Sequence, residues 1–236
     1  DIPNFSLLTS AITEAGVGDF SATALRKALA GMSIRLTPSI SSEDQRIAGS
    51  SSVKDMETML QLAHLYFLAP RKDSVAFEGL KNRTLSFLKN RNASSKVVYN
   101  DSLSAVLYDH NLRMAPVTGE VLAKADYGRI MEIYRERFSD ASNFKTVFIG
   151  KIDMAELRPL LCQYLATLPS TYKKEETDKA NVPQIVMKNE KVKFVHQQET
   201  PLANVSVFYA GNVPFSPKND LVLDVLTRVL QIAYTD

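Results

Sequence analysis

Residues 32–68 read MSIRLTPSISSEDQRIAGSSSVKDMETMLQLAHLYFL, and two different periods follow each other within them. Over 32–40 apolar residues alternate with polar ones, which predicts a strand with one buried face. A second short strand is expected over 44–51, and a helix over 54–68 follows it. Strands that adjoin each other, with no regular alternation with helices, favour an α+β fold with an antiparallel sheet.

Helices are predicted on both sides of this stretch. The first is expected over 4–15, with Phe5, Leu8, Ile12 and Ala15 on its inward face. Further helices are expected over 21–30, 73–92, 95–109, 121–138 and 153–166. The β-branched and aromatic residues of 144–149 predict a strand before the last of these helices.

The composition divides the chain into two predicted domains. Residues 170–184 are rich in lysine and glutamate and poor in apolar residues, which predicts an exposed linker between a front domain, 1–169, and the start of a second domain, 185–236. The second domain is expected to contain strands and one helix, over 185–188, 191–197, 203–210 and 216–233, with a turn at Asn189-Glu190 and a helix cap at Ser216. Because it stops after that helix, we expect exposed apolar surface and self-association there.

The composition is that of a folded globular protein. Of the 236 residues, 45% are hydrophobic and 23% are charged. A formal net charge of +2 is too near zero to indicate a nucleic-acid-binding protein, and no run of about 18 apolar residues predicts a membrane span. The single cysteine, Cys162, excludes an intramolecular disulfide and a cysteine-based zinc site, and its place among leucines predicts a buried, inert thiol.

No residue pattern indicates a catalytic centre. The histidines, His64, His110 and His196, lie far apart, and none has a second histidine one helical turn away, as a zinc site on a helix requires. We expect His64 at the edge of the core and His110 near a helix C-terminus. We therefore predict no metal ligand and no catalytic residue, and we leave the substrate-binding residues unassigned.

Weaker motifs have structural interpretations. Serines 50–52 lack the second glycine of a nucleophile elbow and are expected to cap the helix that follows. Gly16-Val17-Gly18 follows a helix and has no lysine, so a helix-ending turn is favoured over a phosphate site. A solvated helix face explains the basic residues Lys81, Arg83, Lys89 and Arg91 as well as nucleic-acid contact does. The pairs Glu43-Asp44 and Glu175-Glu176 lack the apolar surroundings that raise a carboxyl pKa for acid–base catalysis.

Several stretches, each weakly specific, are together similar to one family. They are GVGDF at 16–20, LAG at 29–31, GSSSVKDMETMLQL at 49–62, LYF at 65–67, PR at 70–71, IYRERF at 133–138, NF at 143–144 and FIGKID at 148–153, with Leu157, Tyr164-Leu165 and Leu168-Pro169 completing the pattern. The pattern spans residues 5–235 and resembles the pitrilysin/insulinase family of zinc metallopeptidases.

The resemblance implies a protein of two homologous halves around a peptide chamber, each half built of two α+β domains, with a His-x-x-Glu-His zinc motif in the first half. The equivalent helix here, 5–15, has no histidine, and Glu14 alone makes no site. The resemblance therefore implies the second, non-zinc half, with the leading strands of its front domain missing and its rear domain truncated. Such a fragment would form part of the chamber wall and help to position peptide. It would hold no zinc of its own and would show no activity alone.

The resemblance also implies partners and a location. An arginine and a tyrosine that hold substrate are expected beyond the helix over 216–233; Arg228 and Tyr234 do not have their spacing, so neither is assigned that role. The expected partners are the zinc-bearing half or a partner subunit and a peptide, with zinc in the parent enzyme and a periplasmic location by analogy with bacterial relatives. Two alternatives stay open: a non-catalytic scaffold or partner subunit of the same family, and an unrelated α+β protein-interaction domain.

Overall fold

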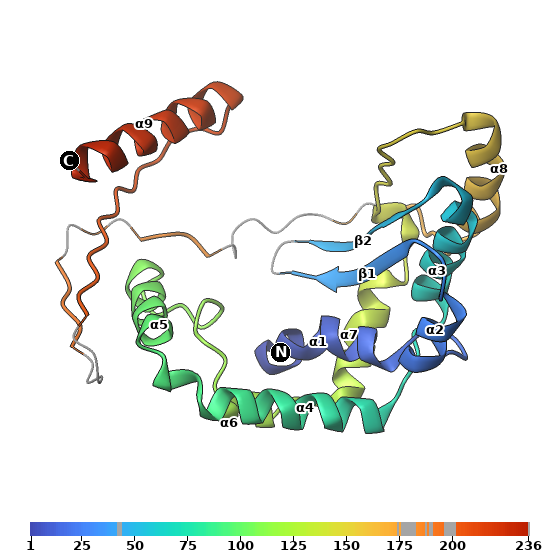
Figure 1. The fold of residues 1–236 in the computed structure, drawn as a ribbon, viewed down its shortest axis with the longest axis horizontal. Coiled ribbons are helices and arrows are strands. Elements are labelled where there is room, and N and C mark those ends of the chain that lie inside the picture. Colours follow the sequence, from blue (N-terminus) through green and yellow to red (C-terminus); the bar gives the residue numbers. More distant parts are fainter. Residues whose placement is uncertain are drawn as a thin grey trace.

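The computed structural model describes residues 1–41, 44–173, 175, 183–186, 188, 191–195 and 202–235. Its helices and strands follow the chain in the order shown in Figure 1: α1 (Ile2–Ala15), α2 (Ala22–Ala28), β1 (Ile34–Ile40), β2 (Gln45–Ser51), α3 (Met56–Leu68), α4 (Ser74–Lys89), α5 (Ser95–Leu107), α6 (Gly119–Ala123), α7 (Tyr127–Phe138), α8 (Met154–Tyr164) and α9 (Pro217–Thr235). The fold is α+β, as predicted, with helices packed against an antiparallel hairpin.

The hairpin forms as the alternating pattern predicts. Strands β1 and β2 pair antiparallel, with Ile34 opposite Ser51 at one end and Ile40 opposite Gln45 at the other. The apolar side chains of one face pack against the core, and these are Ile34, Leu36, Ile40 and Ile47. Since neighbouring residues of a strand point to opposite faces, the intervening polar residues lie on the other side of the sheet.

The core lies among α1, α3, α4 and α7. Tyr134 and Phe138 of α7 are almost fully buried, and their rings stack with centroids 4.5 Å apart. The Tyr134 hydroxyl donates a hydrogen bond of 2.9 Å to the Tyr66 carbonyl oxygen, so the buried phenol is satisfied. Burial of this phenol raises the pKa of Tyr134 above its usual range.

The inward face of α1 differs from the predicted one. Leu8, Ile12 and Ala15 are buried as expected, but Phe5 is 43% exposed. Asn4 and Leu7 occupy the core face instead, one helical turn before Leu8 and Ala11. A shift of one residue turns a side chain by about 100° around the helix, which carries Phe5 to the rim.

The predicted helix over 121–138 is two helices. The Thr118 hydroxyl accepts a hydrogen bond of 3.3 Å from the Val121 N–H and begins α6. The Asp126 carboxylate accepts one of 2.7 Å from the Arg129 N–H and begins α7. A carboxylate that caps a helix N-terminus favours a new start there over continuation of the previous helix.

The strands predicted over 144–149, 185–188, 191–197 and 203–210 are wrong where the structure describes them. Residues 144–149, 185–186, 188, 191–195 and 203–210 have no strand assignment, and β1–β2 is the one sheet in the described part of the chain. A strand needs a hydrogen-bonded neighbouring strand, and the described residues of these segments have none. The predicted turn at Asn189-Glu190, residue 187 and residues 196–197 lie outside the described residues.

Candidate functional site

The structure does not bring the histidines together. His64 of α3 is half-buried, and its Nδ1 lies 2.7 Å from the carbonyl oxygen of Tyr164 in α8, whose ring it meets edge to face. His110 is exposed in the turn after α5, where its φ is 56° and its N–H donates to Ala105. Both lie where the sequence predicts; His196 lies outside the described residues. Over the described ranges, no group of three or more His, Cys, Asp or Glu could hold a metal.

Ser52 stabilises the helix start differently from the prediction. It precedes the short 3-10 turn Val53–Asp55, but its hydroxyl caps no helix N–H. Instead it donates a hydrogen bond of 2.5 Å to the buried Asp55 carboxylate, which also accepts one of 2.9 Å from the Ser33 N–H. The Ser52 hydroxyl, followed by the Ser33 N–H, lowers the pKa of Asp55. These bonds fasten the hairpin to the beginning of α3.

Cys162 is exposed, so the predicted buried thiol is wrong. The buried residue of α8 is Leu157. Five residues further along a helix, a side chain has turned by about 140° from that buried face. A single exposed thiol by itself defines no site.

Gly16-Val17-Gly18 forms the turn that the sequence predicts. Gly16 and Gly18 have φ values of 87° and 55°, and Val17 is fully buried between them. The Val17 N–H donates to Phe20 at 2.9 Å and the Gly18 N–H to Ala69 at 2.8 Å. Because these N–H groups already have acceptors, the turn presents them to no phosphate.

Three of the four predicted basic-patch residues are engaged within the chain. Lys81 donates to the Ala125 carbonyl oxygen at 3.0 Å. Arg83 pairs with Glu14 of α1, and Arg91 pairs with Asp101 of α5. These contacts favour the interpretation as a structural helix face, and they leave the positive charges partly compensated.

The carboxylates and the α9 residues considered above are dispersed. Asp44 bonds with Ser41 in the hairpin turn, and Glu175 pairs with Arg137 at 2.7 Å. Glu43 and Glu176 lie outside the described residues. On α9, the Arg228 Nε lies 3.1 Å from the Asp224 carboxylate, and the Tyr234 hydroxyl lies 2.8 Å from that of Tyr209.

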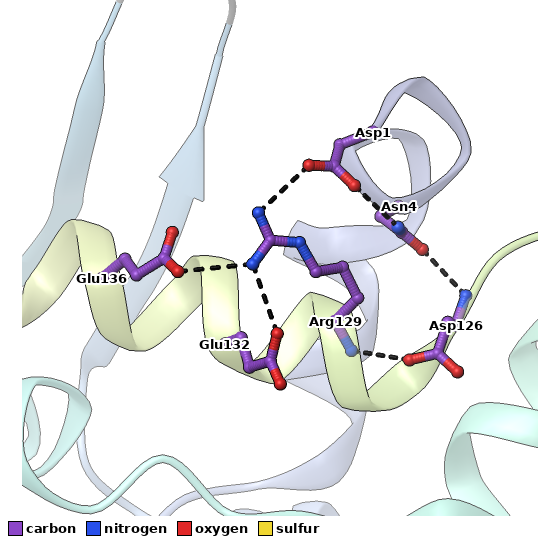
Figure 2. Close-up of polar contacts among 6 residues, drawn as sticks. All are labelled: Asp1, Asn4, Asp126, Arg129, Glu132 and Glu136. Atoms are coloured by element: carbon purple, nitrogen blue, oxygen red, sulfur yellow. Dashed lines mark hydrogen bonds and ion pairs between the residues drawn. The ribbon is translucent and has the colours of Figure 1, made fainter.

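A polar cluster that the sequence analysis missed joins α1 to α7. Figure 2 shows the Arg129 guanidinium between the carboxylates of Asp1, Glu132 and Glu136, at 3.2, 3.2 and 3.3 Å. Glu132, followed by Glu136, raises the pKa of Arg129. The spacing of Glu132 on the same helix was readable from the sequence; the partnership with Asp1 depends on the fold.

The buried member of this cluster is Asn4. Its side-chain oxygen accepts a hydrogen bond of 2.8 Å from the Asp126 N–H, and its amide nitrogen lies 3.3 Å from the Asp1 carboxylate (Figure 2). Asn4 therefore ties the start of α1 to the start of α7. With an always-protonated arginine at its centre, the cluster suits fastening and not proton transfer.

An open groove lies beside the hairpin. It has a volume of about 430 Å³ and lies between β2, α3 and residues 143–152. Its apolar lining from α3 consists of Met56, Met59, Leu60, Ala63 and Phe67. The charged residues that line it are Arg46, Lys145 and Lys151, all basic.

The register of the hairpin shows which main-chain groups of β2 point away from β1. The Ser52 N–H donates to Ser33 at 3.1 Å, and the Ser41 N–H donates to Asp44 at 2.8 Å, at opposite ends of the hairpin. Hydrogen-bonded and non-bonded pairs alternate between these ends. The register therefore directs the main-chain groups of four β2 residues away from β1, namely Gln45, Ile47, Gly49 and Ser51. All four line the groove.

A second feature is a large exposed apolar surface near the C-terminus. In Figure 1, α9 lies apart from the α1–α4–α7 core, with the segment before it running alongside. Val205, Val207 and Phe215 are 88, 60 and 90% exposed, and Leu226 and Val229 of α9 are 48 and 55% exposed. Contiguous exposed apolar residues mark an interaction surface or an association site.

One family model built from known proteins matches part of the chain. Residues 124–232 match the family model described as the peptidase M16 inactive domain. Over these residues the chain is similar to the class of domain that the model describes as inactive in M16 peptidases.

Individual relatives agree with this class. The probable zinc protease PqqL of Haemophilus influenzae is 20% identical over 235 residues, which are 98% of this chain and 25% of the relative. In fold, the periplasmic protease PqqL of Escherichia coli is similar with a TM-score of 0.67 and 17% identity, over 81% of this chain and 21% of that one. A peptidase M16 inactive domain of Pseudomonas fluorescens gives a TM-score of 0.57 and 18% identity over 75% of this chain and 45% of that one.

Chain length and helix hydropathy add two further findings. The chain spans about a quarter of the length of its PqqL relative. Among the helices that the structure describes, none is long and apolar enough to cross a membrane.

Proposed function

We propose that residues 1–236 belong to the non-catalytic half of a zinc metallopeptidase, where they wall the substrate chamber and help to position peptide. The observation that carries this proposal is the match of residues 124–232 to the M16 inactive domain. A wall of this kind contributes to catalysis by orienting substrate, which lowers the entropic part of the barrier without chemistry of its own.

The donor groups of the described residues do not fit zinc. A zinc site needs three or four nitrogen, sulfur or carboxylate ligands converging on one point. The Nδ1 of His64 is in hydrogen-bond contact with the Tyr164 carbonyl oxygen. Glu57, on the same helix as His64, accepts a hydrogen bond of 2.8 Å from the Tyr164 hydroxyl. The proposal therefore assigns zinc to the other half of the parent enzyme.

The partners and the location follow from the same proposal. The zinc-bearing half, in the same polypeptide or in a partner subunit, would close against this unit and bind peptide between the two. The E. coli relative is a periplasmic protease, and on that analogy we propose the periplasm for this protein.

Cleavage of a quenched fluorogenic peptide library, with and without a metal chelator, tests the proposal alongside a measurement of bound zinc. The chain alone is expected to cleave nothing and to hold no stoichiometric zinc, whereas the full product of the parent gene is expected to show chelator-sensitive cleavage. One tightly bound zinc per isolated chain would contradict the proposal. A parent gene without His-x-x-Glu-His would support instead a non-catalytic scaffold or partner subunit.

A further inference from the structure

We propose that Arg137, Asp140 and Asn143 form a clamp that holds the start of the predicted linker against the end of α7. The start of the linker is here residues 169–173 and 175, which the structure describes. The clamp makes these residues part of the front domain, which the composition alone ends at residue 169. It is independent of the proposed role in a peptidase.

The Asp140 carboxylate is the centre of the clamp. It caps the short 3-10 turn Ala141–Asn143, accepting bonds of 2.9 Å from the Ser142 N–H and 2.6 Å from the Ser142 hydroxyl. It also accepts a bond of 3.2 Å from the Thr171 N–H and one from the Thr171 hydroxyl. The Ser142 hydroxyl, followed by the Thr171 hydroxyl, lowers the pKa of Asp140, so the carboxylate is ionised and accepts all four bonds at neutral pH. Hydrogen bonds to a charged acceptor are stronger than those between neutral groups.

Contacts on both sides of Thr171 repeat the connection. The Ala141 N–H donates a hydrogen bond of 2.8 Å to the Pro169 carbonyl oxygen, and the Glu175 N–H donates one of 2.9 Å to the Asn143 side-chain oxygen. The Glu175 carboxylate also pairs with Arg137 at 2.7 Å. Exposed contacts are weak one by one, so a fastening needs several that close on the same few residues, as these do.

Tyr172 lies between the fastened residues in a conformation that tyrosine does not adopt freely. Its φ is 57°, in the left-handed region, and its side chain is 89% exposed. The angle is strained for a residue with a Cβ, and an exposed side chain gains no burial in return. Strain of this kind persists where the surroundings hold the residue in place. The bonds at Thr171 and Glu175 are such surroundings.

The clamp determines where the second predicted domain departs from the first. The lysine- and glutamate-rich composition predicts an exposed tether from residue 170 onwards. With residues 169, 171 and 175 fastened, this stretch moves together with α7. The chain therefore leaves the front domain after Glu175, from a fixed position at the end of that helix.

Hydrogen exchange of the chain of residues 1–236, followed by NMR, tests the clamp. The amides of Thr171 and Glu175 donate to Asp140 and Asn143, and each is expected to exchange at least about tenfold more slowly than an unprotected amide of the same sequence. Asp140→Ala removes the central acceptor and is expected to speed the exchange of both amides at least about fivefold.

Matched variants separate the clamp from general loosening. Asp153→Ala removes the aspartate that caps α8, and it is expected to leave exchange at Thr171 and Glu175 unchanged. Thr171→Val removes one hydroxyl from the clamp and is expected to speed the Glu175 amide about threefold. Thr167→Val removes an exposed hydroxyl that bonds within its own turn to Gln163, and it is expected to change nothing. Circular dichroism verifies that each variant is folded.

Trypsin cleavage after Lys173 gives a second readout, because a protease cuts a fastened segment only after it opens locally. Asp140→Ala is expected to be cut there at least about fivefold faster than the unchanged chain, and Asp153→Ala at the same rate as the unchanged chain. Unprotected exchange at Thr171 and Glu175 in the unchanged chain would overturn the proposal, because the linker start is then a free tether. Equal effects of Asp140→Ala and Asp153→Ala would also overturn it.

Discussion

At the scale of single residues, Gly16 shows how one backbone angle constrains the sequence. Its φ of 87° is in the region that glycine adopts without strain, and a Cβ there would lie 2.2 Å from the Phe20 carbonyl oxygen. Gly31 has a similar φ of 83° but open space around its Cα. The two glycines thus share a positive φ and differ in the space around the Cα atom.

Gly16→Ala is expected to destabilise the fold by at least about 2 kcal/mol more than Gly31→Ala, because the Gly16 backbone (φ 87°, ψ −158°) lies in a region that is essentially restricted to glycine and a Cβ there also clashes with the backbone, whereas Gly31 has open space around it. Urea unfolding of the two variants measures the difference. Equal losses would show that the loop relaxes around residue 16.

Asp55 makes stability depend on pH. Its pKa is lowered in the folded chain, so its contribution is full above the ordinary aspartate value of 3.8 and is lost as the pH falls below that value. Asp55→Asn is therefore expected to lower the urea midpoint at pH 7, with the gap to the unchanged protein narrowing as the pH falls through about 4 to 3. A gap that is constant with pH would contradict the role of the ionised carboxylate.

At the scale of elements, the join between α1 and α7 depends on one buried amide more than on surface charge. Asn4 is 6% exposed and satisfies the Asp126 N–H, whereas Arg129 meets its carboxylates at the partly exposed surface. Loss of a buried partner leaves an unsatisfied group, while exposed ion pairs contribute little.

Asn4→Ala is expected to cost about 1–3 kcal/mol of unfolding free energy, and Arg129→Ala less than about 1 kcal/mol. Thermal or urea unfolding of both variants tests the order. A larger loss for Arg129→Ala, removed by high salt, would show that the ion pairs dominate the join instead.

The helices and the hairpin could be predicted from local pattern, and the failures share one cause. The segments 144–149 and 203–210 have the residues of strands, but strand formation requires a neighbour that their own sequence does not contain. The Phe5 and Cys162 predictions failed because helical periodicity indicates an apolar stripe but not which of its edges meets the core. The two-domain division with a linker over 170–184 stays a prediction.

At the scale of the whole molecule, the exposed apolar surface of 202–215 and α9 predicts association. Leu226 and Val229 lie one helical turn apart and are about half exposed. Sedimentation velocity is expected to show concentration-dependent self-association of the chain, which Leu226→Lys with Val229→Lys reduces. Val75→Lys, at an isolated valine of α4 that is 84% exposed, is the matched control and is expected to change nothing. Association that the α9 variant leaves intact would place the contact elsewhere.

The sequence by itself determined most of the helices, the hairpin, the α+β class and the resemblance to a metallopeptidase half without its zinc motif, because periodicity, capping residues and motif content are local properties. Tertiary structure alone decided the cluster of Arg129 with Asp1 and Asn4 and the groove between β2 and residues 143–152. Both join residues that are distant in the chain. The direction in which the main-chain groups of β2 point becomes visible only once the strand register is known.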